Sequence, residues 1–322
     1  MARFLFSRFL QSVIVLLVMS FVIYGLIGLM PGDPIDLMIT ADPKITAMDA
    51  AHLRELYGLD ESIIKRYVYW LSAAISGDFG FSRLYAQPVL PVMWSAVLNT
   101  IILLGSSFAL ALLIALPLGI VAAMRARTCL DYGVNMLAFA GISIPQFWLA
   151  LMLIIVFAVV LGWLPAGGTA AAAGVEGFWE NGRYLILPVI SLTIASVGTH
   201  TRYMRASMIE TLRQDYIRTA RAKGLSEWQV VIGHALRNAM IPVVTVIALD
   251  FGYLFSGALM TETIFSYPGM GKLIFDSIMG NDFNLALIAL LFATALTLCG
   301  NFLADVAYVA LDRRISLAEL SE

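Results

Sequence analysis

Charged residues are scarce in this sequence, and so are cysteine and histidine. Only 13% of the 322 residues are Asp, Glu, Lys or Arg, whereas 60% are hydrophobic. The cysteines, Cys129 and Cys299, are too few for a disulfide framework, and the three histidines are scattered. Without a cluster of soft ligands, a zinc site is not expected. A mean hydropathy of +0.87 excludes an ordinary soluble domain and indicates a membrane protein.

Several enzyme motifs are also missing from the chain. It has no G-x-x-x-x-G-K-[ST] phosphate loop, so nothing in the sequence predicts ATP hydrolysis by this chain. It has neither an H-E-x-x-H zinc motif nor a G-x-S-x-G nucleophile elbow, which disfavours an intramembrane enzyme. We therefore expect a non-catalytic protein with no cofactor of its own.

Long apolar segments recur along the chain, and a helix needs roughly 20 such residues to cross a ~30 Å hydrocarbon core. The predicted spans cover about residues 9–30, 94–124, 132–163, 184–207, 239–261 and 283–311. The first segment is longer than the core of a secretory signal and ends in MPGDP, so we interpret it as an uncleaved span. Pro145 is expected to bend the third span. The sequence thus predicts an all-α polytopic membrane protein with six transmembrane helices.

The distribution of Lys and Arg predicts how these spans are oriented. Residues 1–8, 125–131, 202–237 and 312–322 together hold 13 of the 20 cations. Most of the other cations lie in the long 33–83 segment, which counts less in the positive-inside rule. Both termini and the 202–237 loop are therefore predicted to be cytoplasmic, which agrees with an even number of spans.

The chain divides into four parts. Residues 1–32 form the cytoplasmic N-terminus and the first span, and residues 33–93 form an outer segment with short helices. A five-helix core at 94–311 carries a cytoplasmic loop at 208–238, and residues 312–322 form a cytoplasmic tail. Within the outer segment, ITAMDAAHLRELYGL and SIIKRYVYWLSAAI each predict a short helix from apolar residues at 3–4 spacing.

One cytoplasmic stretch, DYIRTARAKGLSEWQ from Asp215 to Gln229, is unusually basic for this chain. Asp215 can cap a helix, and Gly224 can end that helix in the left-handed conformation. Ser226 and Gln229 fit a capping box that begins a second helix. We predict two short helices joined by a stiff elbow at Gly224, which can transmit a displacement.

The elbow residues are candidates for contact with another protein. The small side chains of Thr219, Ala220 and Ala222 let a partner surface come close, and the cations around them would steer an acidic groove. Those cations are Arg218, Arg221 and Lys223. Taken alone, the same cations also fit a simple positive-inside anchor.

Asp250 is an acid within the fifth predicted span. Ionisable groups at such depth are costly and face a cavity or a partner, so Asp250 and Ser256 are candidates to line a transport pathway. Pairing of Asp250 with a polar group on a neighbouring helix is the alternative. Asn99 in the second span is expected to make an interhelical hydrogen bond.

A set of specific motifs runs in order along the whole chain. They are LMPGDP, YGLD, WLSAAISGDFGFS, SIPQFWLALMLI, YIRTARAKGLS, HALRNAMIP, ETIFSYPGMGKLI and DVAYVALDRRI. The sequence resembles permease subunits of the dipeptide/oligopeptide/nickel family of ABC importers, and in particular the first permease of each pair. One departure is that the general signature has an acid and two alanines before a glycine, where this chain has Arg218, Thr219 and Ala220 before Gly224.

The resemblance implies a type I ABC importer permease fold and a multi-pass subunit of a bacterial inner-membrane complex. A second homologous permease, two cytoplasmic ABC ATPases that bind ATP and Mg, and a periplasmic or extracellular substrate-binding protein would complete that complex. Residues 215–229 would then contact the ATPases. The outer segment 33–83, then periplasmic, and a hairpin at 262–274 would be candidates for docking the binding protein. Membrane lipid would surround the spans, and no nucleic-acid partner is expected.

The function implied by the resemblance is ATP-driven uptake of di- or oligopeptides or related small solutes, with glutathione and nickel chelates among the possibilities. The sequence does not choose among these substrates. The alternative is a stand-alone proton-coupled secondary transporter. Such a carrier would need inverted halves and paired ionisable groups within spans, and the sequence displays neither.

Overall fold

The computed structural model describes residues 2–29, 61–174 and 177–311, and these are predominantly helical. In chain order the elements are α1 (Ala2–Gly28), α4 (Ile63–Ile75), β1 (Phe81–Ser82), β2 (Gln87–Pro88), α5 (Val89–Met124), α6 (Cys129–Ser143), α7 (Gln146–Leu153), the π-helix η1 (Ile154–Val160), α8 (Phe178–Leu212), α9 (Asp215–Ala222), α10 (Glu227–Gln229), the π-helix η2 (Val230–Ala235), α11 (Leu236–Ile264), α12 (Met270–Met279) and α13 (Phe283–Leu311). The second predicted outer helix is confirmed as α4. The first, within residues 45–59, and the tail at 312–322 lie outside the described residues.

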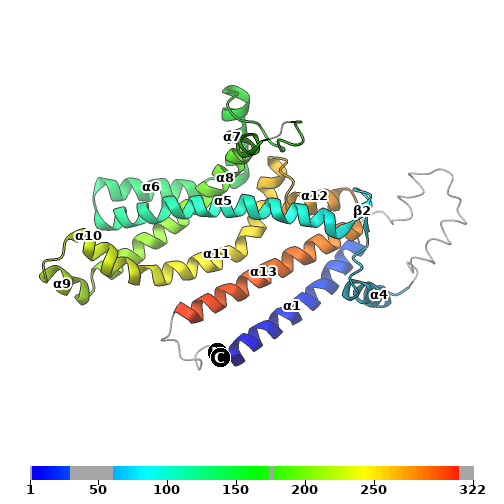
Figure 1. Cartoon of the computed structure of the whole chain (residues 1–322), viewed down its shortest axis with the longest axis horizontal. Coiled ribbons are helices and arrows are strands. Elements are labelled where there is room, and N and C mark those ends of the chain that lie inside the picture. Colours follow the sequence, from blue (N-terminus) through cyan, green and yellow to red (C-terminus); the bar gives the residue numbers. More distant parts are fainter. Residues whose placement is uncertain (1, 30–60, 175–176, 312–322) are drawn as a thin grey trace, which may run out of the picture.

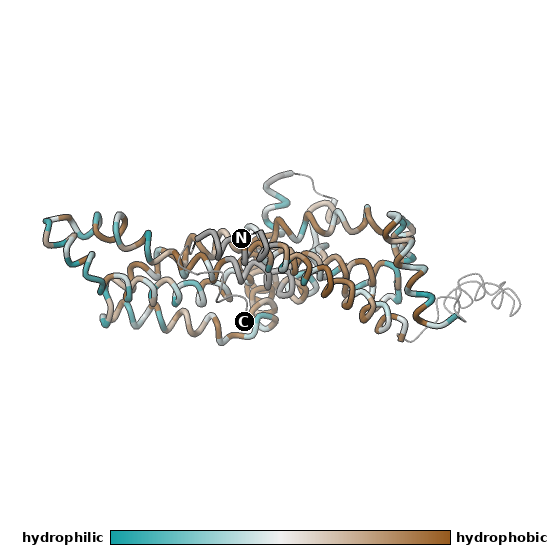
Figure 2. The backbone as a smooth tube through the Cα atoms, turned by 90° about the horizontal axis from the view of Figure 1, so that it is seen from below, coloured by the Kyte–Doolittle hydropathy of each residue, from teal (hydrophilic) through white to brown (hydrophobic). Residues whose placement is uncertain are grey.

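Five helices in the described part of the chain are long and apolar enough to cross a membrane, and a bent pair can supply a sixth. The five candidate spans are Phe6–Gly28, Val89–Met124, Trp179–Leu212, Glu227–Ile247 and Phe283–Leu303. Figure 2 shows apolar residues along much of the bundle and hydrophilic residues at the end that carries α9. The predicted all-α class is confirmed, and the six predicted spans are reached when the bent pair counts as one span.

The long helices run along the long axis of the molecule (Figure 1). We call the end of the bundle that carries α9 and α10 the α9 end, and the opposite end, which carries α4 and the short hairpin β1–β2, the α4 end. α13 runs beside α1, and the first turn of α1 and the last turn of α13 both point toward the α9 end. The two ends of the described chain therefore share a side with the predicted cytoplasmic loop.

The third predicted span is divided at Pro145. α6 ends at Ser143 and α7 begins at Gln146, with Pro145 at the N-cap between them. The two segments meet at 97°, so the single bent helix that we expected is replaced by two helices. Proline explains the break, because it has no N–H for the helix ladder and pushes the preceding residue into extended backbone. Ile144 is indeed extended, with a ψ of 123°.

α8 packs closely against its neighbours through glycines. A Cβ at Gly119 of α5 would lie 2.7 Å from the Cβ of Met204, and one at Gly198 would lie 2.4 Å from the carbonyl oxygen of Ala138. Either contact is too short for a real side chain, so only glycine permits these approaches. In lipid the hydrophobic effect does not bring helices together, so membrane helices associate through close packing. Small residues allow that packing, because the backbones of the two helices can approach each other.

Two apolar cores lie near opposite ends of the bundle. At the α4 end, Val89 and Met93 of α5 pack with Leu273 of α12 and Leu285 of α13. At the α9 end, residues of α5, α8, α9, η2 and α11 form a second core. Its buried members are Ala123, Met204, Met208, Ile217, Ala220, Val230, Val231, Ala235, Ala239 and Val243. The elbow is thus part of a packed core rather than a free loop.

Candidate coupling site and transport pathway

The elbow between α9 and α10 forms as the sequence predicts. Gly224 has a φ of +81°, in the left-handed region that glycine adopts without a Cβ clash. The Gly224 N–H donates to the Arg221 carbonyl at 2.9 Å, which closes the last turn of α9. Ser226 and Gln229 make the full capping box, with the Ser226 N–H donating to Gln229 Oε1 at 3.0 Å. The predicted elbow geometry is confirmed.

The role predicted for Asp215 as helix cap is wrong. Gln214 is the N-cap residue, and Asp215 is the first residue of α9. Its carboxylate instead lies 3.3 Å from the Arg218 guanidinium, and both side chains are exposed. An acid in the first turn still interacts favourably with the positive end of the helix, so Asp215 suits α9 without capping it.

The inner face of α9 anchors the elbow to the bundle. Ile217 is fully buried and Ala220 is 6% exposed, and both pack in the core at the α9 end. Ala220 therefore contacts the chain itself, and the expectation that it meets a partner surface does not fit its burial. Thr219 and Ala222 lie on the exposed side and are open to a partner. α9 is thus packed from beneath against α8 and η2.

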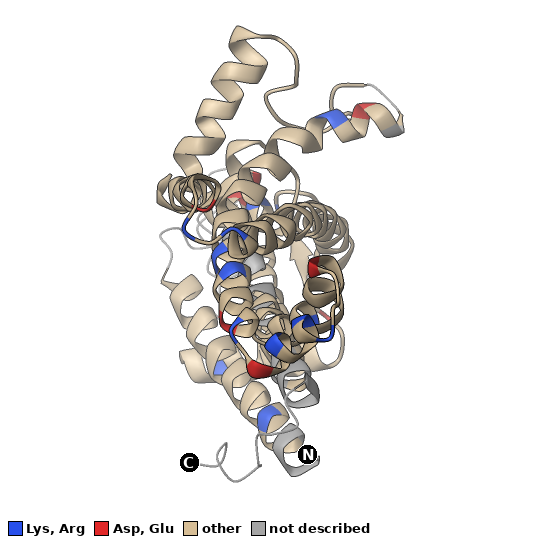
Figure 3. Cartoon of the chain, turned by 90° about the vertical axis from the view of Figure 1, so that its left-hand side faces the viewer, with Lys and Arg blue, Asp and Glu red and all other residues tan. Residues whose placement is uncertain are grey.

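An ion pair bridges the two sides of the elbow. The Arg221 guanidinium on α9 donates to both Glu227 carboxylate oxygens on α10, at 2.8 and 3.2 Å. Such a bidentate pair fixes geometry more than it adds stability, because both side chains are exposed to solvent. Arg221 therefore has its ion-pair partner within the elbow, whereas Lys223 makes no ion pair within the described residues. Seen from the α9 end, basic residues gather on the nearer ribbons (Figure 3).

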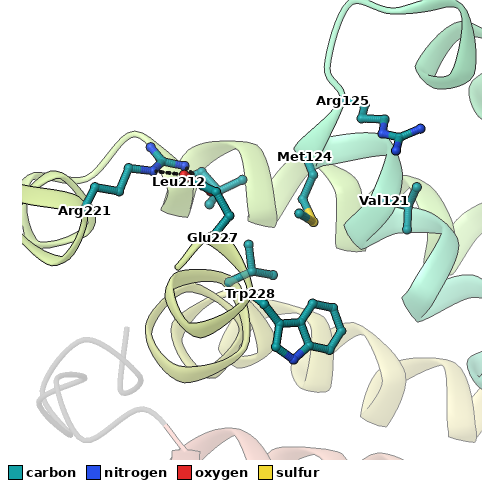
Figure 4. Close-up of a pocket in the computed structure, with 8 residues that line it drawn as sticks. Val121, Met124, Arg125, Leu212, Arg221, Glu227 and Trp228 are labelled. Carbon is teal, nitrogen blue, oxygen red and sulfur yellow. Dashed lines mark hydrogen bonds and ion pairs between the residues drawn. The ribbon is translucent and has the colours of Figure 1, made fainter. Parts of the chain in front are cut away.

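A pocket of about 570 Å³ lies beside the elbow (Figure 4). Its walls come from the last turn of α5, the end of α8, α9, and α10 with η2. The lining residues are Val121, Met124, Arg125, Leu212, Arg221, Glu227, Trp228 and Val231. Trp228 is 67% exposed, so a large apolar surface adjoins the Arg221–Glu227 pair. The elbow and the end of α5 therefore present one continuous surface with a hollow between them.

The helix that leaves the elbow includes a π-helix, which the sequence did not predict. Val230–Ala235 forms η2 and continues directly into α11, so one helical run connects the elbow to a membrane span. The candidate span accordingly begins at Glu227, well before the predicted residue 239. π-helical turns are rare and frequently occur at functional sites. The elbow is thus joined to the membrane span of α11 with no loop between them.

A buried ion pair at the start of α6 is a second feature that the sequence analysis missed. The Asp131 side chain is 1% exposed, and Arg205 of α8 donates to its two oxygens at 2.5 and 2.7 Å. Asn135 and the Arg127 N–H also donate to this carboxylate, each at 2.8 Å. A buried carboxylate with four donors links α6 to α8 near the elbow. In the sequence, Asp131 marks only the edge of an apolar run.

Two further buried carboxylates, Glu262 and Asp282, each accept hydrogen bonds from several elements toward the α4 end. Thr100 donates to Glu262 at 2.6 Å, and the N–H groups of Gly271 and Lys272 donate to it at 2.7 and 3.1 Å. Glu262 thereby joins the end of α11 to α5 and to the first turn of α12. Only glycine fits beside it, since a Cβ at Gly269 would lie 2.2 Å from this carboxyl group.

Asp282 is the second of these carboxylates and holds the β1–β2 hairpin onto the start of α13. It accepts from the Ser82 hydroxyl at 2.6 Å, from the Leu84 N–H at 3.0 Å and from the Leu285 N–H at 3.2 Å. The predicted hairpin at 262–274 is a helix–turn–helix made by α11 and α12. The two predicted docking regions meet where Phe79 packs against the core that contains Met270 and Leu273 of α12.

The predicted pathway residues are only partly placed. Asp250 and Ser256 lie in α11, but their side chains are outside the described part of the structure. Asn99 was expected to bond to another helix and instead donates to the Pro268 carbonyl in a turn, at 2.9 Å. That contact joins α5 to the turn between α11 and α12.

Comparison with known proteins places the chain in a transporter family. The family described as "Binding-protein-dependent transport system inner membrane component" matches residues 115–317, and the family that describes the N-terminal part of such proteins matches residues 1–92. The fold and the elbow define the permease subunit of an ABC importer. The chain belongs to the family of binding-protein-dependent transport system inner membrane components.

The relatives cover nearly the full chain. The oligopeptide transport system permease protein AppB of Bacillus subtilis (strain 168) is 38% identical over 316 residues, which are 98% of this chain and 99% of the relative. The glutathione transport system permease protein GsiC of Escherichia coli (strain K12) is 35% identical over 315 residues, 98% of this chain and 99% of the relative.

Solved structures support the fold. The inward-facing MetNI methionine ABC transporter matches with a TM-score of 0.57 at 19% identity, over 69% of this chain and 97% of that one. An amino acid ABC transporter crystallised with histidines matches with a TM-score of 0.51 at 14% identity, over 70% of this chain and 94% of that one. The predicted type I ABC importer permease fold is confirmed.

Proposed function

We propose that this chain forms half of the pore of an ATP-driven importer for small peptides, and that α9 and the elbow couple the pore to the ATPases. A second permease subunit, two cytoplasmic ATPases and an external binding protein complete the assembly. The substrate class rests on the relatives, whose names specify oligopeptides and glutathione. Their 38% and 35% identities extend over 98% of this chain.

The single observation that carries the coupling role is the way the elbow is built. Its outer side exposes Arg218, Thr219 and Lys223, while its inner side is locked into the core of the bundle by Ile217. A surface that is exposed outside and rigidly packed inside can pass a push from a partner to the helices behind it. A mobile loop would absorb the same push.

The proposed site is on the cytoplasmic side of a bacterial inner membrane, with both termini on that side. The short loops at this end carry most of the cations, as the positive-inside rule requires. ATP and Mg are bound by the ATPase partners in this scheme, and this chain supplies no group to the hydrolysis. The binding protein would dock at the α4 end, where Phe79 packs against the core that contains Met270 and Leu273 of α12.

The test is transport by the complex that co-purifies with the chain, reconstituted in proteoliposomes. We expect uptake of labelled peptides to require ATP and binding protein, and to persist when an uncoupler collapses the proton gradient. The double variant Arg218→Glu with Lys223→Glu should lose most uptake and most stimulation of ATP hydrolysis by loaded binding protein. Arg183→Glu, at a half-buried cation near the start of α8 that pairs with Glu180 far from the elbow, controls for the effect of reversing a charge. Normal coupling in the double variant would refute the assigned role of the elbow.

A further inference from the structure

α4 has several distinct faces, although none of its residues is fully buried. One face packs against α1 through aromatic side chains. The Tyr67 hydroxyl lies 2.6 Å from the Ser20 hydroxyl, and the Tyr67 ring centroid lies 5.2 Å from that of Phe21. Trp70 adds a contact to Tyr24, with ring centroids 5.8 Å apart. α4 is therefore attached to a membrane span.

These contacts fix the depth of α4 along α1. The candidate span of α1 ends at Gly28. At a rise of about 1.5 Å per residue, Ser20 lies roughly 12 Å and Tyr24 roughly 6 Å before that end. An interfacial helix lies with its apolar face about 5–10 Å into the boundary between headgroups and acyl chains. α4 is thus attached at the level of the membrane interface rather than in bulk water.

A second face of α4 is apolar and uncovered. It consists of Ile64, Val68 and Ile75, which are 63%, 55% and 79% exposed. At 3.6 residues per turn, these side chains lie within about 40° of one another around the helix. Single exposed apolar residues are ordinary, but an aligned stripe over several turns marks a contact with something apolar.

The remaining face is polar and carries groups suited to lipid headgroups. Lys65 donates to Glu61 at 2.9 Å and keeps its long side chain at the surface, and Ser72 is exposed nearby. Tyr69 is 70% exposed, and tyrosine is enriched where membrane meets water. One apolar and one polar face along the same helix is the pattern of a helix that lies in the plane of the interface.

The neighbouring span indicates what covers the apolar face. Only 17% of the most apolar window of α1 is buried, and Val22 and Leu26 near its end are 41% and 61% exposed. Much of the surface of α1 at this depth therefore faces the bilayer. The same bilayer surrounds α4, which is attached to α1 at that level.

We propose that α4 is an interfacial membrane helix whose Ile64, Val68 and Ile75 side chains insert among the lipid acyl chains at the α4 end. The insertion holds the end of α1 and the adjoining β1–β2 hairpin at a fixed depth. The inference is independent of the transported substrate and of the ATPase partners.

The test uses the full chain in lipid nanodiscs with single spin labels. Cys129 and Cys299, both exposed, are first replaced by serine. Labels are then placed by Ile64→Cys, Val68→Cys and Ile75→Cys, and at the polar controls Lys65→Cys and Ser72→Cys. Collisions with oxygen, which concentrates in the bilayer, are compared with collisions with a water-soluble nickel chelate.

We expect oxygen collisions to exceed nickel collisions several-fold at the three apolar positions, with the order reversed at the two controls. Greater exposure to nickel at the apolar positions would overturn the proposal. So would exclusion of both reagents there, because it would mean that protein covers the stripe. Dipolar broadening between labels would likewise reject it in favour of a second copy of the chain.

Discussion

Gly224 is the residue at which the elbow depends most directly on backbone conformation. Glycine adopts its φ of +81° without strain, whereas a residue with a Cβ is destabilised by roughly 1–2 kcal/mol in the left-handed region. No atom lies near the place of its missing Cβ, so crowding adds nothing to that cost. The effect of substitution is therefore a clean measure of backbone strain.

We predict that Gly224→Ala reduces coupled ATP hydrolysis and lowers the thermal stability of the α9 end, because alanine is strained in the left-handed conformation at this position. Gly224→Asn should do so less, since asparagine tolerates the left-handed region better. Hydrogen exchange of α9 and the transport assay measure the two effects. Equal behaviour of the two variants would show that strain at this position is unimportant.

Glu262 yields a second prediction at this scale. Glu262→Ala removes the acceptor for the Gly271 and Lys272 N–H groups, and each buried N–H left unsatisfied costs about 1–3 kcal/mol. We expect a lower midpoint of thermal unfolding for the purified protein. Asp276→Ala is the matched control, because its i,i+4 pair with Lys272 is worth only about 0.3–0.5 kcal/mol. Similar losses in both variants would contradict a special role for Glu262.

The residue scale also shows what the sequence could and could not predict. Gly224, Ser226 and Gln229 were predictable, because capping and left-handed conformations depend on a few consecutive residues. Glu262 and Asp131 were not, since their importance comes from donors far along the chain, such as Thr100 and Arg205. A lone acid at the end of an apolar run gives no sign of a distant partner.

At the scale of elements, α9 has one face for the bundle and one for the outside. Ala220 is buried against the core while Ala222, two residues along, is exposed. We predict that Ala220→Leu overpacks the core, at a cost of about 1–3 kcal/mol, and displaces α9. Limited proteolysis of the elbow would report that displacement.

Ala222→Leu adds the same volume on the exposed face and serves as the matched control. It should leave the stability and proteolysis of the elbow unchanged. If it also abolishes ATPase coupling in the assembled complex, the exposed face contacts a partner. A stable, protease-resistant Ala220→Leu protein would contradict the packing seen for α9.

Element boundaries followed the sequence where local chemistry decides them. α13 covers the predicted 283–311, and α4 ends where its apolar pattern stops. The 97° turn at Pro145 was predicted only as a bend, because proline marks a break without fixing its angle. The π-helix η2 was not predicted, because the sequence of Val230–Ala235 has no local signature that separates a π-helix from an α-helix.

At the scale of the whole molecule, the orientation of the bundle decides how the two ends are used. The positive-inside rule uses only the positions of cations in short loops, and the sidedness that it gives for this bundle stays a prediction. The sequence could not predict that the β1–β2 hairpin is joined to the start of α13, because that arrangement depends on Asp282. The fold therefore shows what the predicted topology lacks: at the α4 end, the β1–β2 hairpin is bonded to α13 and α4 is bonded to α1.

The predicted sidedness is testable with single cysteines in a chain lacking Cys129 and Cys299. A membrane-impermeant maleimide should label Lys223→Cys only in inside-out vesicles, because the elbow is cytoplasmic under the positive-inside rule. Ser72→Cys, on the polar face of α4, should be labelled only in right-side-out vesicles, and this position controls for vesicle integrity. Labelling of Lys223→Cys from outside would place the elbow away from any cytoplasmic ATPase. In that case the cations at the α9 end would face outward and could not serve a coupling role, whatever the sequence similarity.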